Sequence, residues 1–208
     1  CLAEACRAAA AEARADYGEP RDAGAPTGVA VVAMGKLGGQ ELNYSSDIDL
    51  MFVYGADGET AGGRRGRLGN GDYFARVCRE VVALLEAVTE EGYVFRVDLR
   101  LRPEGRMGAI VLSLDGYRAY YRDRAELWER QALLKARIAA GDERVGSAFL
   151  DLVREVVHRP GLDARIVPAI RAMKREIDRA LGRTGAEPGK KNVKLGRGGI
   201  REIEFLVQ

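Results

Sequence analysis

The sequence predicts an α/β fold of the α+β kind, in which a small mixed β-sheet is followed by helices. A valine-rich apolar run over residues 29–34 and a second, largely apolar run over 47–54 flank a glycine-rich loop over 35–46, a pattern typical of two buried strands. From residue 114 onward the apolar residues recur at helical spacing. We therefore expect an N-terminal helix with a linker, a core sheet and a helical region, over residues 1–27, 28–113 and 114–208.

Secondary structure around the two strands follows from periodicity and from turn residues. Apolar positions at helical spacing predict that Asn70 or Asp72 caps a helix, and strict alternation predicts a strand that ends at Pro103. The expected elements are helices over 1–17 and 72–90, strands over 93–102 and 109–112, and loops over 18–27 and 55–70.

The C-terminal region reads as helices joined by short connections. Trp128 lies in the first helical pattern, together with Leu133 and Leu134, and we expect it to pack in the core. The segments expected after it are helices over 142–158 and 166–181, a basic loop over 183–197, and a last helix from about residue 199.

Length and composition indicate a soluble globular protein. The chain has 208 residues, 47% hydrophobic and 31% charged, which is enough to bury a core of its own. A formal net charge of +2 argues against nucleic acid as a partner, and no apolar run approaches the ~18–20 residues of a membrane span. The chain begins with Cys1 and stops at Gln208 within a helical pattern, so we expect a fragment of a longer protein.

The cysteine and histidine content excludes two common kinds of site. Cys1, Cys6 and Cys78 form no CxxC pair, which argues against a disulfide framework or structural zinc and favours the reducing cytoplasm. His158 is the single histidine, so this chain alone cannot build a multi-histidine metal site. We expect His158 near the C-terminus of the helix that precedes it.

Asp47 and Asp49 are the strongest candidates for chemistry. Residues two apart in a strand point to the same face, so these two carboxylates project together while Ile48 packs on the other face. Two adjacent carboxylates repel each other unless a cation lies between them, and hard oxygen ligands of this kind suit Mg²⁺. The alternative is a strand end at the solvent, which the apolar continuation over 51–53 disfavours.

A second polar strip lies on the predicted strand over 93–102. Alternation places Arg96, Asp98, Arg100 and Arg102 on one face, where guanidinium groups can bind phosphate oxygens in pairs. If this strand lies beside the Asp47 strand, Asp98 adds a third carboxylate, and three carboxylates can hold two Mg²⁺ ions about 3.5–4 Å apart. The alternative is a solvated face stabilised by Asp–Arg pairs.

The glycine-rich loop after the first strand is a candidate phosphate cradle. Backbone amides at Gly35, Gly38 and Gly39, together with the charge of Lys36, can bind phosphate. The loop matches neither the dinucleotide-binding nor the Walker A spacing, so a plain tight turn is the alternative.

A strand, a glycine loop, an Asp-x-Asp strand and a distant third Asp strand together resemble the nucleotidyltransferase fold of the polymerase-β superfamily. Most members have Gly-Ser in that loop, where this chain has Gly35-Lys36. The motifs GKLGGQELNYSSDIDLMFVY, VDLRLRPEG, WERQALLKAR and GRGGIREIEFLVQ, in that order, resemble the bacterial glutamine synthetase adenylyltransferase family, which adenylylates and deadenylylates its target. The resemblance covers about residues 29–208 and implies one of the family's two catalytic halves.

The resemblance also implies which half is present, what it acts on and which residues take part. Asn43, Ile48, Arg201 and Glu202 favour the N-terminal half, which is implied to remove AMP from a tyrosine of glutamine synthetase by phosphorolysis, giving ADP. The implied cofactor is Mg²⁺, the nucleotide is ATP or ADP, and the PII signal protein is implied as a regulator of the whole enzyme. The implied ligands of the metal are Asp47, Asp49 and Asp98, and the nucleotide or phosphate contacts are Gly35, Lys36, Gly38, Gly39, Ser46, Arg100, Arg102, Lys135, Arg137 and Glu204.

Three alternatives remain open at this point. The same residues can run the reaction in the adenylylating direction, with ATP as donor. A catalytically silent module that senses nucleotide or PII is disfavoured by the three acids, and a polymerase or tRNA-modifying relative is disfavoured by the near-neutral charge. For Lys135 and Arg137, ordinary solvated positions on an amphipathic helix stay equally open.

Overall fold

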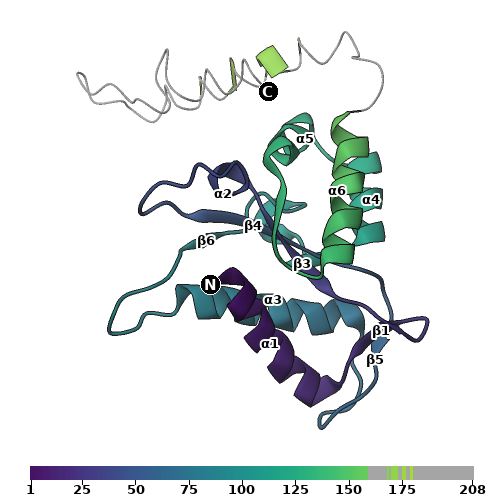
Figure 1. Ribbon diagram of the computed structural model, residues 1–208. Helices are drawn as coiled ribbons and strands as arrows, with labels where there is room; N and C mark the ends of the chain where they lie inside the picture. Colours follow the sequence, from purple (N-terminus) through teal and green to yellow (C-terminus); the bar gives the residue numbers. More distant parts are fainter. Residues whose placement is uncertain (159–167, 169, 173–174, 177–178, 180–208) are drawn as a thin grey trace. The chain divides into compact units, whose positions relative to one another are not determined.

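The computed structural model describes residues 1–158 together with residues 168, 170–172, 175–176 and 179. It has the mixed α/β architecture that the sequence predicts (Figure 1). Residues 1–158 form one compact unit and 159–208 a second, of which the described residues are helical. Glu204, the expected last helix and the basic loop before it lie outside the described residues.

The main sheet is built around two buried strands. β3 (Val29–Ala33) and β4 (Ile48–Tyr54) pair antiparallel over five register positions, and their apolar side chains cover both faces. β8 (Arg137–Gly141) pairs antiparallel with the other edge of β3. β6 (Val97–Asp98) and β7 (Val111–Ser113) both pair parallel with β4, β6 near its start and β7 near its end.

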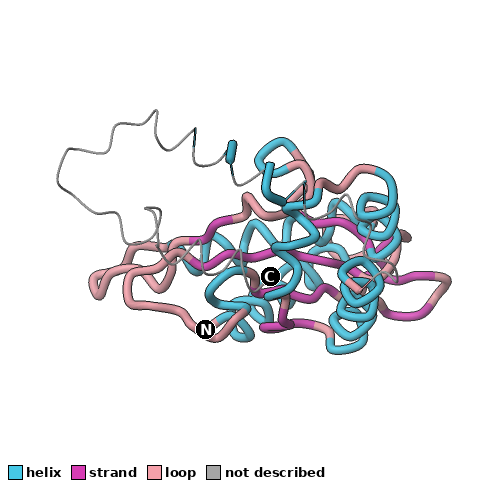
Figure 2. The backbone as a smooth tube through the Cα atoms, turned by 90° about the horizontal axis from the view of Figure 1, so that it is seen from above, coloured by secondary structure: helices cyan, strands magenta, loops and turns pink. Residues whose placement is uncertain are grey.

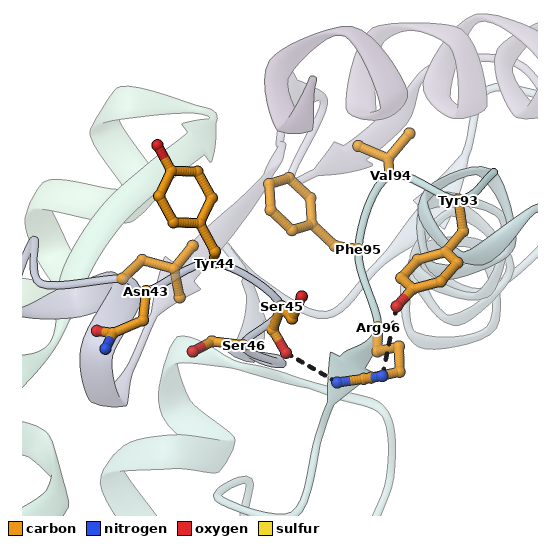
Figure 3. Close-up of a pocket in the computed structure, with 9 residues that line it drawn as sticks. Asn43, Tyr44, Ser45, Ser46, Tyr93, Val94, Phe95 and Arg96 are labelled. Atoms are coloured by element: carbon orange, nitrogen blue, oxygen red, sulfur yellow. Dashed lines mark hydrogen bonds between the residues drawn. The ribbon is translucent and has the colours of Figure 1, made fainter. Parts of the chain in front are cut away.

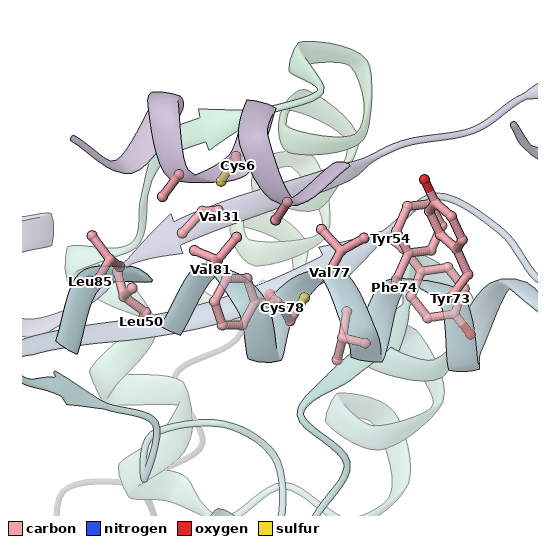
Figure 4. Packing of buried hydrophobic residues seen from close by; sticks show 14 of the residues in the cluster. Cys6, Val31, Leu50, Tyr54, Tyr73, Phe74, Val77, Cys78, Val81 and Leu85 are labelled. Carbon is pink, nitrogen blue, oxygen red and sulfur yellow. The ribbon is translucent and has the colours of Figure 1, made fainter. Parts of the chain in front are cut away.

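Helices cover both faces of this sheet (Figures 1 and 2). α1 (Leu2–Tyr17) and α3 (Asn70–Glu86) pack on one face, while α4 (Leu114–Asp123) and α6 (Glu143–Val157) pack on the other. Alternate residues of β4 therefore enter two different cores. Leu50 and Phe52 join the α1–α3 side, shown in Figure 4, and Met51 and Val53 join the α4–α6 side.

Half of the residues predicted as an N-terminal linker are in strands. Residues 18–27 contain β1 (Pro20–Asp22) and β2 (Ala25–Pro26), which form a small sheet with β5 (Glu59–Thr60). The predicted cap of α3 is also wrong, because Gly69 holds the cap position and the Asn70 amide donates to the carbonyls of Arg21 and Ala56. Asn70 thus ties the small sheet to the helix.

The strand predicted over 93–102 is reduced to two residues in β6. The Asp98 carboxylate accepts the backbone N–H of Arg100 at 2.8 Å, and the N–H of Arg102 donates to Leu99 O at 3.3 Å. A side chain that bonds to its own backbone competes with sheet pairing, so the alternating sequence turns away from β4 after Asp98. The turn leads to a 3₁₀ helix, η1 (Gly105–Met107), and then to β7 at the predicted return strand.

The region predicted as helical also contains a strand. α5 (Leu127–Ala132) and η2 (Leu133–Lys135) are followed by β8, so residues on both sides of position 113 build the same sheet. Trp128 is 40% exposed rather than part of the core, and the neighbouring Glu129 is buried instead. The Glu129 carboxylate accepts from the Tyr120 hydroxyl at 2.8 Å and from the backbone N–H of Glu126.

The cysteines and the single histidine lie in the described part of the chain, and the position of His158 is the one that the sequence predicts. All three cysteines are free thiols, and His158 holds the C-cap position of α6. No helix among the described residues has the length and apolar character needed to cross a bilayer.

Candidate functional site

The predicted acids lie in or next to the short segment where β4 pairs with β6. Asp49 and Asp98 are register partners in this parallel pair, as Ile48 and Val97 are beside them. Register partners on neighbouring strands share a face of the sheet, so the two carboxylates lie on one face. Asp47, directly before β4, lines the same cavity of about 490 Å³ as Asp98. The structure thus brings together residues that are 49 positions apart in the sequence.

Two arginines hold two of these carboxylates. Arg96 Nε donates to Asp47 Oδ1 at 2.5 Å, and Arg100 Nε donates to Asp98 Oδ2 at 2.8 Å. The hydrogen bond from Arg100 holds the pKa of Asp98 below its ordinary value. The pKa of Arg100 is raised, chiefly by Asp98 and further by the charges of Asp49 and Asp47.

These Asp–Arg pairs are the arrangement that the sequence left open as the alternative to a metal site. Among the described residues, no three Asp, Glu, His or Cys side chains are grouped closely enough to hold a metal ion. The chemistry of the donors nevertheless fits a hard divalent cation, because Asp47, Asp49 and Asp98 supply only carboxylate oxygens. Metal binding by these three residues stays a prediction.

Arg102 and Arg106 line the same cavity as Arg96 and Arg100. The Arg102 guanidinium, however, donates to the carbonyl of Leu99 at 2.8 Å and to that of Gly108 at 3.4 Å. In this structure Arg102 therefore fixes the loop that carries Arg100 and Arg106. Its role as a phosphate contact stays a prediction.

The glycine-rich segment forms a one-turn helix, α2 (Gly35–Gly38), where a loop was predicted. Gly35 has φ +51°, and a Cβ at this position would lie 2.3 Å from Asp49 Oδ2. The Met34 N–H donates to Asp49 O at 2.9 Å, which continues the pairing of β3 with β4 up to the turn. Gly35 is therefore required for the backbone of the turn to lie against the Asp49 carboxylate.

The end of α2 packs against the segment before β8. A Cβ on Gly38 would lie 1.9 Å from Lys135 O, and the N–H groups of Gly38 and Gly39 donate to carbonyls inside the turn. Arg137 Nη2 donates to Leu37 O at 2.9 Å, so its guanidinium caps the turn. Lys135 pairs with Glu41, and this hydrogen bond is the main cause of a lowered pKa of Glu41.

Lys135 and Arg137 thus lie beside the glycine turn and not on a solvated helix face. Lys135 is in η2 and Arg137 begins β8, and both side chains contact the 35–41 segment. Sequence reasoning placed them near the site but on the wrong element. Whatever they contribute to ligand binding, they also position α2 next to Asp49.

A second pocket of about 690 Å³ lies next to the acidic cavity. Its walls are the loops over 42–46 and 93–96, and Figure 3 shows the rings of Tyr44 and Phe95 on facing sides. Ser46, predicted as a phosphate contact, lines this pocket. Arg96 lines both cavities, so they are neighbours that share one guanidinium.

Comparison with known proteins identifies the family. Residues 1–152 match the family described as Glutamate-ammonia ligase adenylyltransferase, which is well over half of the chain. The chain belongs to this family. Residues 171–208 match a second family, described as GlnD PII-uridylyltransferase.

Three relatives of this adenylyltransferase-family chain share the name "Bifunctional glutamine synthetase adenylyltransferase/adenylyl-removing enzyme". The protein of Hahella chejuensis is 45% identical over all of this chain and 21% of its own length. That of Pseudomonas syringae pv. tomato is 45% identical over 92% of this chain and 19% of its own. That of Burkholderia pseudomallei is 46% identical over 96% of this chain and 22% of its own. The chain thus spans about a fifth of the length of these relatives.

Sequence reasoning missed three features of the site in this family member. The pairing of Arg96 with Asp47, the capping of α2 by Arg137, and the pocket between two loops all depend on contacts between distant segments. Of these three features, only the pocket had a signal in the sequence. Tyr44 and the run over 93–95 place aromatic and apolar residues in segments that otherwise read as polar or exposed.

Proposed function

We propose that this chain is a nucleotidyltransferase unit that removes AMP from an adenylylated tyrosine of glutamine synthetase by phosphorolysis. An oxygen of inorganic phosphate forms a bond to the phosphorus of the tyrosyl-AMP diester, and the bond from that phosphorus to the tyrosine oxygen breaks. The tyrosine oxygen leaves with the electron pair and takes up a proton, and the other product is ADP. The register pairing of Asp49 with Asp98, with Asp47 on the same cavity as Asp98, carries this proposal.

The three carboxylates are the residues that would hold Mg²⁺, which when bound neutralises charge on the phosphate oxygens. Arg100 lowers the pKa of Asp98, which extends to lower pH the range in which this carboxylate is ionised, the form that a cation requires. Arg96 and Arg100 are placed to exchange their carboxylate partners for phosphate oxygens, since guanidinium groups bind both in the same paired geometry. Lys36 follows Gly35 in α2, and we propose its positive charge as a further phosphate contact.

We propose the direction of the reaction from the residues of the motif around the Asp pair. Asn43 and Ile48 in this motif favour the deadenylylating half. The relatives are named as bifunctional, so the adenylylating direction, with ATP as donor, is the second candidate. We further propose that PII signal protein regulates the whole enzyme, which the match of residues 171–208 to a PII-uridylyltransferase family supports.

The test combines the chain, Mg²⁺ and adenylylated glutamine synthetase, with and without inorganic phosphate, and follows ADP. We expect ADP release that requires phosphate, stops with EDTA, and is lost in Asp47→Asn. Asp22→Asn, an exposed aspartate on β1, is the matched control and should keep full activity. Transfer of AMP from ATP to unmodified glutamine synthetase, without phosphorolysis, would reverse the proposed direction. Full activity of Asp47→Asn would overturn the role of the acids, and a chain with neither activity would favour the regulatory module.

A further inference from the structure

The pocket between the 42–46 and 93–96 loops differs in chemistry from the acidic cavity beside it (Figure 3). Among the described residues that line it, Arg96 is the only one with a charge, and the others are aromatic, aliphatic or small and polar. Phosphate groups are bound by several cations or by metal ions, so this lining does not suit a chain of phosphates. It suits a ligand that is mostly apolar.

The apolar side chains at this pocket are exposed to an unusual degree. Tyr44 is fully exposed, and Tyr93 and Val94 are 49% and 48% exposed. Phe95 is half-buried, because one part of it packs on the α1–α3 core. Grouped exposed apolar residues on a soluble protein mark a surface that a partner covers, and tyrosine and arginine are enriched in such surfaces.

Arg96 connects this pocket with the catalytic acids. Its Nε bonds to Asp47 Oδ1, its Nη2 donates to Ser45 O at 2.9 Å, and its Nη1 donates to the Tyr93 hydroxyl at 3.3 Å. The positive charge therefore lies at the end of the pocket that adjoins the acidic cavity. A ligand that is apolar along its length and carries one phosphodiester at one end matches this distribution of charge.

We propose that the pocket receives the polypeptide segment of the target protein that carries the adenylylated tyrosine, with apolar residues near that tyrosine covering Tyr44 and Tyr93. The inference rests on the proposed function, which requires that a tyrosine of a folded protein reach the acids. The residues on either side of that tyrosine must then lie within one side-chain length of the acidic cavity, and this pocket adjoins it. Tyr44 and Tyr93 are thereby contacts of the protein substrate and not of the nucleotide.

The experiment compares two substrates on the variants Tyr44→Ala, Tyr93→Ala and the double variant. One substrate is adenylylated glutamine synthetase, and the other is the adenylyl ester of N-acetyltyrosinamide, which has no flanking residues. We expect kcat/KM for the protein to fall about tenfold or more in the double variant, through KM, while that for the small ester stays within about twofold. Val88→Ala, also exposed but outside the pocket lining, should change neither.

The outcomes separate this inference from the proposed function. Equal losses on both substrates would place the adenosine in the pocket and overturn the inference, as would a double variant with unchanged kinetics. If the unaltered chain turned over neither substrate, the proposed function would fail, and binding would still test the pocket. In that case immobilised glutamine synthetase should bind the unaltered chain more tightly than the double variant, and equal binding would overturn the inference.

Discussion

The two ends of β4 are supported in different ways, although they belong to one strand of seven residues. At the C-terminal end of β4, Phe52, Val53 and Tyr54 lie between β3 and β7. The Tyr117 hydroxyl donates to Phe52 O at 3.0 Å. At its start, Asp49 is paired with a two-residue strand that turns away after Asp98. The C-terminal end of β4 is thus stabilised by buried apolar area. The N-terminal end has less of this stabilisation and presents charged side chains. Ile48, next to Asp49, is fully buried in the α1–α3 core.

The largest effect on stability should follow from Phe52→Ala. Phe52 is 1% exposed, and removing a buried phenyl ring leaves a cavity as well as a loss of buried apolar area. We expect the free energy of unfolding to fall by about 3–5 kcal/mol, measured by urea denaturation. Phe52→Leu, which refills most of the space, should lose much less. If both variants matched the unaltered chain, the buried end of β4 would not be the stabilising one.

A smaller loss of stability is expected at the charged end, from Gly38→Ala. The new methyl group would collide with the backbone oxygen of Lys135, which cannot rotate away as a side chain can. We expect a loss of about 1–3 kcal/mol in the free energy of unfolding. Gly39→Ala is the matched control, because its φ is −73° and its nearest neighbour is the flexible end of Glu41. Equal losses in the two variants would show that close backbone packing is not what supports α2.

Asp47→Asn should separate stability from catalysis. Asp47 is exposed at the start of β4, and its partner Arg96 is exposed as well, so the pair is screened by solvent. We expect the free energy of unfolding to change by less than about 0.5 kcal/mol, while phosphorolysis is lost. Thermal melts and the ADP assay on the same preparation measure both. A large drop in stability would mean that the charged end supports the fold after all.

The smallest effect should be a pH-dependent one at Glu41. Lys135 lowers the pKa of Glu41 in the folded chain, so the pair stabilises the fold above the pKa of the unfolded chain and loses this effect as pH falls through the folded pKa. In urea denaturation at a series of pH values, the unaltered chain should be slightly more stable than Glu41→Gln near neutral pH. The difference should vanish in acid. Glu12→Gln, at an exposed position on α1, is the control and should show no such trend.

Much of the fold could be predicted because its central elements have strong local signals. β3, β4 and α3 follow from apolar runs or from helical spacing, and the structure contains all three. β8 could not be predicted, since Arg137–Gly141 has a single β-branched residue and becomes a strand only by pairing with β3. The strand over 93–102 was over-predicted because alternation does not reveal that Asp98 bonds to the backbone of Arg100.

The candidate site was predictable to the extent that it follows from strand geometry. The period of two placed Asp47 with Asp49, and the structure pairs Asp49 with Asp98 as the predicted neighbouring strands require. The contacts of Arg96 and Arg137 were not predictable, because each joins segments far apart in the sequence. A sequence pattern predicts which face of a strand or helix a residue lies on. These contacts depend instead on how distant segments are placed in the folded chain.

The pairing of β4 with β6 also bears on how the protein folds. The bond between Arg96 and Asp47 closes a loop of 49 residues, which costs roughly 3 kcal/mol of chain entropy before any contact forms. Two residue pairs offset little of that cost, so we expect α3 and the sheet beneath it to form before β6 pairs with β4. We therefore expect the acids to come together late in folding, once the core of the chain has packed.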